Sequence, residues 1–405
     1  MQPVRGTKDY IFEDAEKFEA IINIAQNISQ NYNFKTIHTP IFEETQVFSR
    51  SMGEESDVVS KEMYSFDTKG GENITLRPEF TAGIVRAFIS NGLQQHIPLK
   101  LFSYGPVFRY ERPQKGRQRQ FHQVNFEYFG NPEPTADAEM IFCASQLLEN
   151  LGVSEGLSLN INTLGDSESR KNYQSALVEY LSKYQVELSE DSKRRLAKNP
   201  LRILDSKDEN DKKIIATAPL ISDYLNDFSK NFFEKLLNFI SGKIKTEIKV
   251  NPKIVRGLDY YSHSVFEFIL ESENLGSQNT ILAGGRYDAL VEQMGGKQTP
   301  AIGFAAGVER LMLASQISRK NNNLLAIISD FDDKALETAS ILRAKNINCE
   351  VIFSGKFAKK IQKADKIGSK NILFIFEDKI EIKNLDSGEQ KITNISEVIQ
   401  NYSSI

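Results

Sequence analysis

Four residues that could bind a polar ligand recur at every second position in the stretch from Gln120 to Phe129. They are Phe121, Gln123, Asn125 and Glu127. Side chains alternate between the two faces of a β-strand, so one face would present an aromatic ring, two amides and a carboxylate. A core-facing strand would be apolar here, and we therefore predict a sheet-borne pocket for a polar ligand that carries a positive group. The alternative interpretation is a solvated face beside a charged loop, and this stretch alone does not decide between the two.

Two antiparallel strands are expected to position these residues, one from about Leu99 to Arg109 and one from about Gln120 to Phe129. Both stretches are rich in aromatic and β-branched residues, as strands prefer. The loop between them is too long and too basic to be a plain turn, and Arg109 stands at its mouth. The charged residues of the loop are Glu111, Arg112, Lys115, Arg117 and Arg119. This excess of cations beside a polar face favours a ligand that also carries an anionic group.

Three further arginines stand in unusual surroundings. Arg256 precedes a glycine and the paired Tyr260 and Tyr261 at the entry to an apolar strand, and a guanidinium among aromatic rings is costly to bury unless it meets an anion. Arg286 and Arg310 each follow a run of small residues, and we expect each arginine to lie in the first turn of a helix. The small residues would let the backbone approach a ligand closely. Tight strand-to-helix packing would also explain the glycines, although not the repeated arginines.

Glu79 and Thr81 lie between an expected strand and an expected helix, and this helix would end at Gly92. Helix N-termini favour negative charge, so the favoured interpretation of Glu79 is a capping carboxylate. As a pocket carboxylate, Glu79 would instead bind an ammonium group.

Composition and motifs limit the function classes. The chain has 405 residues, 40% hydrophobic and 26% charged, with a net charge of −4, which describes an ordinary protein with an ample core rather than one coated by nucleic acid. No apolar run is long enough for a membrane span, and neither GxxxxGK[ST] nor GxGxxG occurs. Cys143 and Cys349 are expected to be buried free thiols in a reducing cytosol, and four scattered histidines give no direct signature of a metal site.

The periodicity divides the chain into two domains. Residues 1–322 alternate strands with helices and are interrupted at about 166–245 by a polar stretch of helical periodicity, which predicts a helical insertion. Residues 323–405 read as a small α/β domain with a largely parallel sheet. Six lysines against Asp365 alone in the stretch 356–370 suggest a phosphate-facing patch, with a solvated helix as the default interpretation.

With these residues in place, the chain closely resembles the histidyl-tRNA synthetases, a family of class II aminoacyl-tRNA synthetases. The matching pieces, in the family's order, are RGTKDY, TLRPEFTAG, FRYERPQKGRQRQFHQ, RGLDYY, AGGRYDALVEQMGG and PAIGFAAGVERL. The resemblance implies an α+β fold, with an antiparallel catalytic sheet of six or seven strands, a helical insertion and a C-terminal anticodon-binding domain. It also implies a cytoplasmic homodimer, with no membrane association, that pairs through the region from Phe34 to Arg50 and uses ATP, Mg²⁺, L-histidine and tRNA(His).

The resemblance assigns roles to individual positions. The reaction would be attack of the histidine carboxylate on the α-phosphorus of ATP, followed by attack of the terminal tRNA ribose on the acyl-adenylate. Arg109 and Arg256 would be catalytic, since both would stabilise charge at the α-phosphate. The histidine pocket would comprise Glu79, Thr81, Gln123, Glu127, Tyr260 and Tyr261. The ATP site would comprise Arg109, Glu111, Arg117, Phe121 and Arg310. Phe80 departs from the pattern, because a small residue is common at its position in bacterial relatives.

Two other functions compete with the synthetase hypothesis. A catalytically silent paralogue that regulates histidine biosynthesis would keep the histidine pocket but tend to lose the ATP arginines and the C-terminal domain. An RNA-binding or scaffold protein with a decayed active site would also tend to lose the ATP arginines and the C-terminal domain. Because Arg109, Arg117, Arg256 and Arg310 are all present together with the terminal domain, a working synthetase is the favoured hypothesis.

Overall fold

The computed structural model describes residues 1–53, 56–254, 260–273, 275, 279–317 and 324–402. The chain forms two compact units, residues 1–317 and 318–405, and each is described by itself. No helix in the described ranges is both long and apolar enough to cross a membrane.

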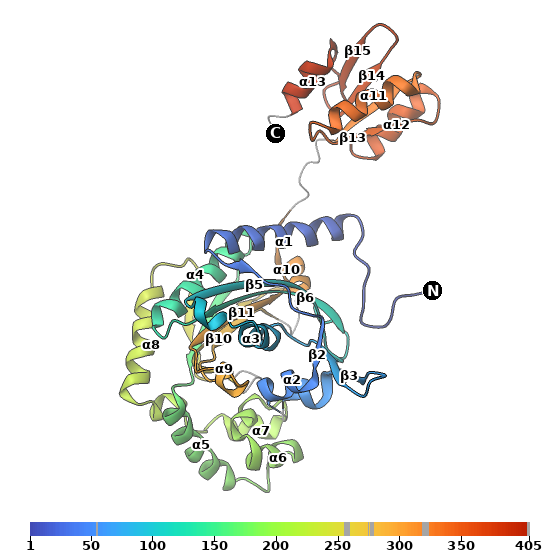
Figure 1. The fold of residues 1–405 in the computed structure, drawn as a ribbon. Coiled ribbons are helices and arrows are strands. Elements are labelled where there is room, and N and C mark those ends of the chain that lie inside the picture. The colour runs from blue at the N-terminus through green and yellow to red at the C-terminus, as the bar shows by residue number, and fades with distance from the viewer. Residues whose placement is uncertain (54–55, 255–259, 274, 276–278, 318–323, 403–405) are drawn as a thin grey trace. The chain divides into compact units, whose positions relative to one another are not determined.

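The first unit is built on an eight-stranded sheet (Figure 1). Its order is β1 (Lys35–Thr36), β5 (Leu99–Phe108), β6 (Gln120–Phe129), β11 (Ala301–Gly307), β10 (Thr280–Arg286), β9 (Ser262–Leu270), β7 (Leu157–Thr163) and β8 (Glu247–Val250). The pairings from β5 to β7 are all antiparallel, whereas β1 and β8 pair parallel at the two edges. The six antiparallel strands agree with the expected six or seven, and two short parallel edge strands extend the sheet to eight.

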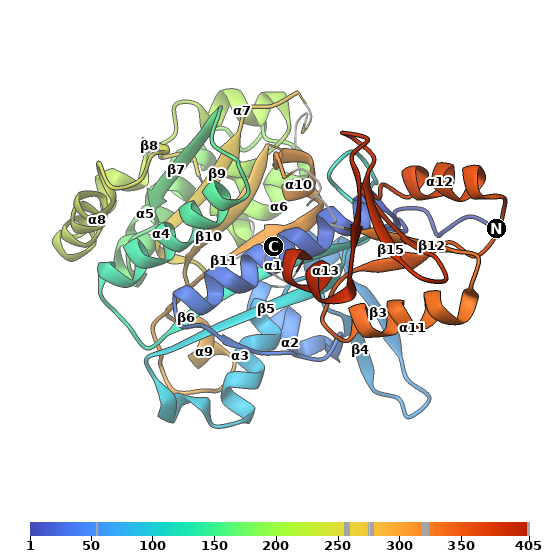
Figure 2. The same ribbon diagram turned by 90° about the horizontal axis from the view of Figure 1, so that it is seen from above.

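Helices cover both faces of this sheet, as Figures 1 and 2 show from two directions. One buried cluster combines strand residues with α1 (Glu13–Asn31), α4 (Pro134–Asn150), α8 (Asp227–Ile240) and α10 (Val308–Ala314). A second cluster, on the opposite face, includes α2 (Thr45–Met52), α3 (Thr81–Ser90) and α9 (Leu290–Gln293). The side chains of β6 divide between these faces, with Val124, Phe126 and Tyr128 packed in the first cluster.

A small three-stranded sheet precedes α3. Its order is β2 (Phe42–Glu44), β4 (Asn73–Leu76) and β3 (Tyr64–Asp67). The sequence from Phe34 to Phe48 predicts a strand interrupted by Pro40. The structure has only the short strands β1 and β2 there, and the prediction is wrong from Thr45 on, where α2 begins. Phe48 and Met52 are four residues apart and fully buried, so burial of one helical face outweighs the β-propensity of the stretch.

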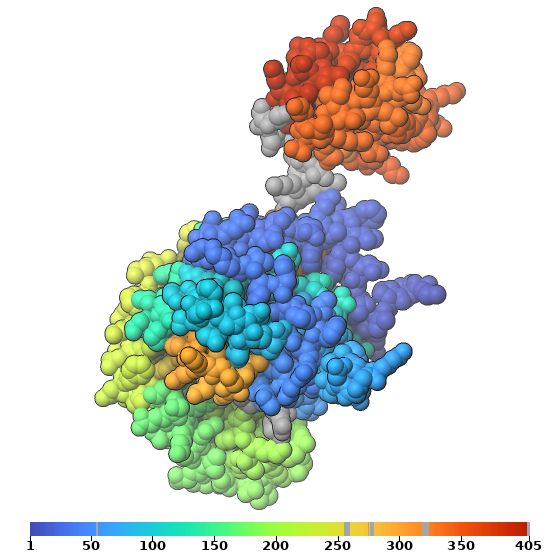
Figure 3. All heavy atoms as spheres, viewed as in Figure 1, coloured from blue at the N-terminus to red at the C-terminus, as the bar shows by residue number. Residues whose placement is uncertain are grey.

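The polar stretch 166–245 forms four helices and two 3₁₀ turns. The helices are α5 (Ser167–Ser182), α6 (Glu190–Lys198), α7 (Glu209–Ile215) and α8. Each begins at a residue whose side chain accepts a hydrogen bond from a backbone amide of the first turn, namely Asp166, Ser189, Asp208 and Asn226. The 3₁₀ turns are η3 (Pro200–Asp205) and η4 (Ile221–Tyr224). In the space-filling view this insertion, in green and yellow-green, is continuous with the rest of the first unit (Figure 3).

Arg286 does not enter the first turn of a helix, so that expectation was wrong. It ends β10 and is fully buried, where its Nε donates to Asp137 Oδ2 at 3.0 Å and its Nη1 donates to the Asn131 carbonyl at 3.0 Å. A buried guanidinium requires such a partner, and Asp137 lies far away in the sequence, on α4. Arg286 therefore holds the loop before α4 against the sheet. Arg310 lies in the first turn of α10, as expected.

The second unit is a five-stranded sheet with three helices. Its order is β13 (Cys349–Val351), β12 (Leu325–Ser329), β14 (Asn371–Ile375), β15 (Ile380–Asn384) and β16 (Gln390–Thr393), and the helices are α11 (Asp332–Arg343), α12 (Phe357–Lys366) and α13 (Ile395–Tyr402). The pairings of β12 with β13 and β14 are parallel, but β14–β15 and β15–β16 are antiparallel. The expectation of a largely parallel sheet therefore holds for only half of it.

Candidate active site

A cavity of about 350 Å³ opens on the face of the sheet that carries α3. Its walls come from strands β6, β9, β10 and β11, from the start of α3 and from the loop that joins β5 to β6. Eleven predicted site residues line it, which are Glu79, Thr81, Arg109, Glu111, Arg117, Phe121, Gln123, Glu127, Tyr260, Tyr261 and Arg310. Arg256 lies outside the described residues. The structure thus brings together positions that are up to 231 residues apart, from 79 to 310.

The alternation predicted for the strand 120–129 is present. Phe121, Gln123, Asn125 and Glu127 all line the cavity. Among the described residues, neither Gln123 Oε1 nor Asn125 Oδ1 has a hydrogen-bond partner, although both atoms are buried. Unsatisfied buried acceptors are costly, so these two amide oxygens are available to a ligand that donates hydrogen bonds.

Glu127 forms the floor of one end of the cavity. Its carboxylate is fully buried and accepts hydrogen bonds from Thr81 Oγ1 at 2.6 Å and from the hydroxyl of Tyr287. Burial raises the pKa of Glu127 from 4.5 to about 8, because an ionised carboxylate loses its hydration there, while the two hydroxyl donors oppose this effect. Tyr287 was not among the predicted site residues, since the motif that contains it drew attention to Arg286.

Gly303 makes room for the Glu127 side chain. It pairs with Glu127 across β6 and β11, and a Cβ atom added at Gly303 would overlap Glu127 Oε2. A side chain at this strand position would therefore displace the carboxylate, so the glycine is required by a close approach rather than by its backbone conformation.

Glu79 fits both interpretations offered by the sequence. Its carboxylate accepts the backbone amides of Thr81 at 2.6 Å and Ala82 at 2.7 Å, as a capping residue would, and it also lines the cavity. Burial raises the pKa of Glu79, whereas the two amide hydrogen bonds and Arg109 lower it. The neighbouring Phe80 is buried beneath the Arg77 guanidinium, 4.1 Å from its ring centroid, and does not line the cavity.

Three tyrosines complete this end of the cavity. The rings of Tyr260 and Tyr261 lie 4.8 Å apart, and Tyr260 meets Tyr287 edge-on at 5.6 Å. Burial raises the pKa of both Tyr260 and Tyr287 well above 10, so their hydroxyls stay protonated and can donate hydrogen bonds.

The other end of the cavity is cationic. Arg310 donates to the Gly116 carbonyl at 3.2 Å and to the Thr280 carbonyl at 2.7 Å, which fixes its guanidinium beside the loop. Arg109 donates to the Pro78 carbonyl at 2.9 Å and lies 5.6 Å from the Phe121 ring centroid. Burial lowers the pKa of Arg310, and the positive charges of Arg117 and Arg109 lower it further. An anion at this end would relieve that repulsion.

Two carboxylates accompany these arginines. Glu111 forms an ion pair with Arg117 at 2.5 Å, and Glu267 accepts a hydrogen bond from Thr280 Oγ1 at 3.2 Å. Both carboxylates line the cavity and interact electrostatically with Arg310. Among the described residues, no group of three or more histidine, cysteine, aspartate or glutamate side chains is arranged to hold a metal ion.

Glu309 also lines the cavity, and sequence reasoning missed it as well. It accepts the Tyr10 hydroxyl at 2.9 Å and the backbone amide of His122 at 2.9 Å, and it contacts His122 Nδ1 at 2.9 Å. Tyr10 thereby ties the RGTKDY segment to the strand that carries Phe121. The only signal in the sequence was the position of Glu309 beside Arg310, which does not reveal partners so far away.

Comparisons with known proteins agree with this arrangement. The sequence model of the family described as "Histidyl-tRNA synthetase" matches residues 6–311. The chain belongs to the histidyl-tRNA synthetase family. A protein of Wolbachia pipientis (strain wPip) named histidine–tRNA ligase is 49% identical over 408 residues, which cover 99% of each chain.

Solved structures of this family extend the comparison. The apo histidyl-tRNA synthetase of Staphylococcus aureus superimposes with a TM-score of 0.83 at 33% identity, covering 100% of both chains. The predicted family and the predicted α+β class II fold are therefore confirmed. A Bacillus halodurans structure titled ATP phosphoribosyltransferase regulatory subunit/histidyl-tRNA synthetase superimposes with a TM-score of 0.67 at 19% identity. The match covers 92% of this chain and 97% of that chain, and it shows a shared fold alone.

Proposed function

We propose that the chain is a histidine–tRNA ligase, which activates L-histidine with ATP and transfers it to the 3′ end of tRNA(His). The observation that carries this proposal is the division of a single cavity into an end of carboxylates and tyrosines and an end of arginines. An amino acid with an ammonium group and an imidazole fits the first end, and a nucleotide triphosphate fits the second. The names of the full-length relatives point to the same reaction.

At the histidine end, two buried carboxylates face a ring of neutral hydroxyl donors. We assign the α-ammonium group to Glu79, Thr81 and Gln123, and the imidazole nitrogens to Glu127, Tyr260 and Tyr261. A site built to hydrogen-bond both ring nitrogens would reject amino acids that lack them, because its buried polar groups would then be left unpaired. Tyr287 would orient Glu127 without touching the substrate.

At the ATP end, Arg109 would bind the α-phosphate, and Arg117 and Arg310 would hold the outer phosphates, with Phe121 beneath the adenine. Arg256 remains a prediction, since it falls outside the described residues. Glu111 and Glu267 fit Mg²⁺, which is usually held by one or two carboxylates together with substrate phosphates and water. When bound, the metal ion would supply positive charge against the phosphates.

The proposed chemistry requires positioning and charge stabilisation rather than a nucleophilic side chain. The histidine carboxylate attacks the α-phosphorus, pyrophosphate leaves, and a ribose hydroxyl of the tRNA then attacks the acyl-adenylate. Half-buried arginines fixed by backbone carbonyls, such as Arg310, are preorganised to stabilise the charge that develops in the first step.

We assign residues 323–405 to binding of the tRNA anticodon. Three phenylalanines in this unit are exposed, which are Phe331, Phe353 and Phe357, and five of the six lysines in 356–370 are exposed as well. Exposed rings beside lysines suit unstacked bases and phosphates. The exception is Lys360, which is buried and contacts the Ser329 carbonyl and Asp330, so its role is structural.

We further propose a cytoplasmic homodimer that pairs through the region 34–50. This region leaves Ile41 and Phe42 exposed, at 43% and 54%, which suits burial against a second copy. Sedimentation as a monomer at micromolar concentration would contradict the dimer.

The alternative function is the histidine-binding regulatory paralogue. It is not favoured, because relatives about half identical over 99% of the chain are named histidine–tRNA ligase and because all the described ATP-site arginines line the cavity. Charging assays decide between the two, since only a ligase would transfer labelled histidine to tRNA(His). Binding of histidine without charging would support the paralogue.

A further inference from the structure

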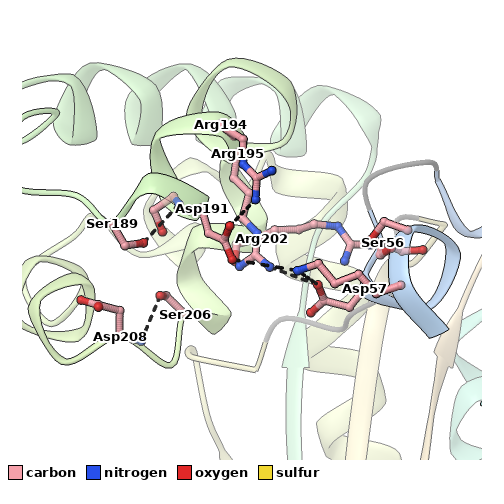
Figure 4. Close-up of polar contacts among 12 residues, drawn as sticks. Ser56, Asp57, Ser189, Asp191, Arg194, Arg195, Arg202, Ser206 and Asp208 are labelled. Carbon is pink, nitrogen blue, oxygen red and sulfur yellow. Dashed lines mark hydrogen bonds and ion pairs between the residues drawn. The ribbon is translucent and has the colours of Figure 1, made fainter. Parts of the chain in front are cut away.

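A short segment of the first unit lies between the helical insertion and the basic loop 109–119 that joins β5 to β6, which we call the arginine loop. It consists of Ser56, Asp57 and the π-helical turn η1 (Val58–Glu62). On the insertion side it meets α6, as Figure 4 shows. We call this segment, residues 56–62, the bridging segment.

Four charged side chains of alternating sign join the bridging segment to α6. Asp57 Oδ1 lies 3.4 Å from Arg195 Nη2 and 3.4 Å from Lys61 Nζ, and Lys61 Nζ lies 4.0 Å from Asp191 Oδ2. Asp191 also interacts electrostatically with Arg195, which closes the set, and we call these four residues the charge ring. Arg195 is its least exposed member, with 18% of its side chain accessible.

Two buried residues of the bridging segment, Val58 and Ser56, accompany the charge ring. Val58 belongs to the same buried cluster as Leu196 and Leu201 of the insertion. Ser56 is fully buried, and its hydroxyl and carbonyl oxygens accept the amides of Val59 at 3.1 Å and Ser60 at 2.8 Å. The turn is therefore internally fixed, and it would move as one piece.

The opposite end of the bridging segment contacts the arginine loop. The Glu62 carbonyl accepts the backbone amide of Tyr110 at 2.7 Å. Tyr110 stands between Arg109 and Glu111, both of which line the cavity. The pKa of the Glu62 carboxyl is raised by burial and by Glu111, and lowered by Arg109, so this side chain also lies close to the loop.

We propose that the insertion positions the arginine loop for ATP through the charge ring and the Glu62–Tyr110 hydrogen bond. Asp57 and Arg195 are then positioning residues for a site that neither of them lines. Exposed ion pairs contribute little to the free energy of unfolding, so the consequence of breaking this one lies in where the loop is held. The inference rests on the proposed histidine–tRNA ligase function.

A charge-reversal cycle tests this inference. The variants are Asp57→Arg, Arg195→Asp and the double variant, and Lys212→Glu is the matched control. Lys212 belongs to the same insertion, and its ammonium group pairs with Glu209, three residues earlier, at 2.7 Å. The KM values for ATP and for histidine are measured by histidine-dependent exchange of pyrophosphate into ATP.

Each single reversal places like charges side by side. We expect the KM for ATP to rise about fivefold, equivalent to about 1 kcal/mol. The KM for histidine should stay within about twofold. The double variant restores opposite charges at positions 57 and 195 but places like charges beside Lys61 and Asp191, so its effect on the KM for ATP should be smaller than the product of the two single effects. Hydrogen exchange of the Tyr110 amide should accelerate in the single variants, and the acceleration in the double variant should likewise be smaller than the product of the two.

Unchanged KM values and unchanged Tyr110 exchange in both single variants would overturn the inference, and so would a double variant whose effect equals the product of the two single effects. If the wild-type protein catalysed no exchange of pyrophosphate, the proposed function would fall instead. The Tyr110 amide would then decide alone whether the insertion holds the loop, since its exchange rate does not depend on catalysis.

Discussion

Replacing Glu127 with glutamine removes the titratable carboxyl at the floor of the cavity with almost no change in shape. Thr81 and Tyr287 donate to different oxygens of Glu127, so one of them keeps an oxygen atom to donate to and the other hydroxyl accepts from the new amide group. Any cost of this rearrangement is the same at every pH. The carboxyl, by contrast, titrates, so the two proteins should differ in how their free energy of unfolding depends on pH.

The sign and the magnitude follow from the raised pKa. Burial raises the pKa of Glu127 in the folded protein to about 8, against 4.5 for an unburied carboxyl. Below pH 4.5 the group is protonated in both states and its contribution to stability is fully present. As the pH rises, the unfolded state releases its proton first, so stability is lost until the pH passes the folded pKa. Between pH 6 and pH 8 the loss is about 2 kcal/mol.

Urea unfolding at pH 6, 7 and 8, followed by circular dichroism, measures this difference. The wild type should lose about 2 kcal/mol more than the Glu127→Gln variant between pH 6 and pH 8. Contributions from the second unit and from other titrating groups are shared by both proteins and largely cancel. A constant difference across this range, or a wild type that gains stability relative to the variant, would refute the assignment of a buried protonated carboxyl.

Three further substitutions probe separate parts of the account. Gly303→Ala should raise the KM for histidine at least about tenfold, because the added methyl displaces Glu127. The control Gly70→Ala should leave this KM unchanged, because a Cβ added there would make only ordinary contacts at 3.6 Å. Arg310→Ala should raise the KM for ATP by about tenfold or more while equilibrium dialysis finds histidine binding intact, and a loss of histidine binding would contradict the division of the cavity. Phe353→Ala should raise the KM for tRNA(His) about tenfold in charging assays, since stacking contributes about 1–3 kcal/mol per base, and an equal loss of pyrophosphate exchange would show that the effect is not on RNA.

The part of the site that follows from the sequence is the part set by local geometry. Strand alternation is enough to place Phe121, Gln123, Asn125 and Glu127 on one face, and the hairpin of β5 and β6 lies within one residue of its predicted bounds. Glu79 at the start of α3 is predicted for the same reason, because a strand, a proline and a helix follow one another in a short stretch.

What the sequence could not predict depends on partners far away along the chain. Arg286 looked like a ligand-facing arginine until the structure placed Asp137 beside it in the core. Tyr287 and Glu309 are recognisable only once their partners Glu127, His122 and Tyr10 are close. The helix α2 replaces an expected strand because tertiary burial of its apolar face outweighs local propensity.

The sheet of the second unit was expected to be largely parallel, and its two antiparallel strands near the C-terminus were missed for a related reason. The strands β15 and β16 are short and polar, at 380–384 and 390–393, and their alternation is weak. They take a strand conformation through pairing, β15 with β14 and β16 with β15, so no stretch of the sequence marks them alone.

Histidine-dependent exchange of labelled pyrophosphate into ATP, in the wild type and in Arg109→Ala, tests the central claim most directly. The proposed ligase predicts robust exchange that requires histidine and is largely lost in the variant, because the arginine beside the α-phosphate is removed. The same loss is predicted for Arg256→Ala. A wild-type protein that binds histidine yet exchanges no pyrophosphate, with or without tRNA(His), would contradict the claim and leave the regulatory paralogue as the better explanation.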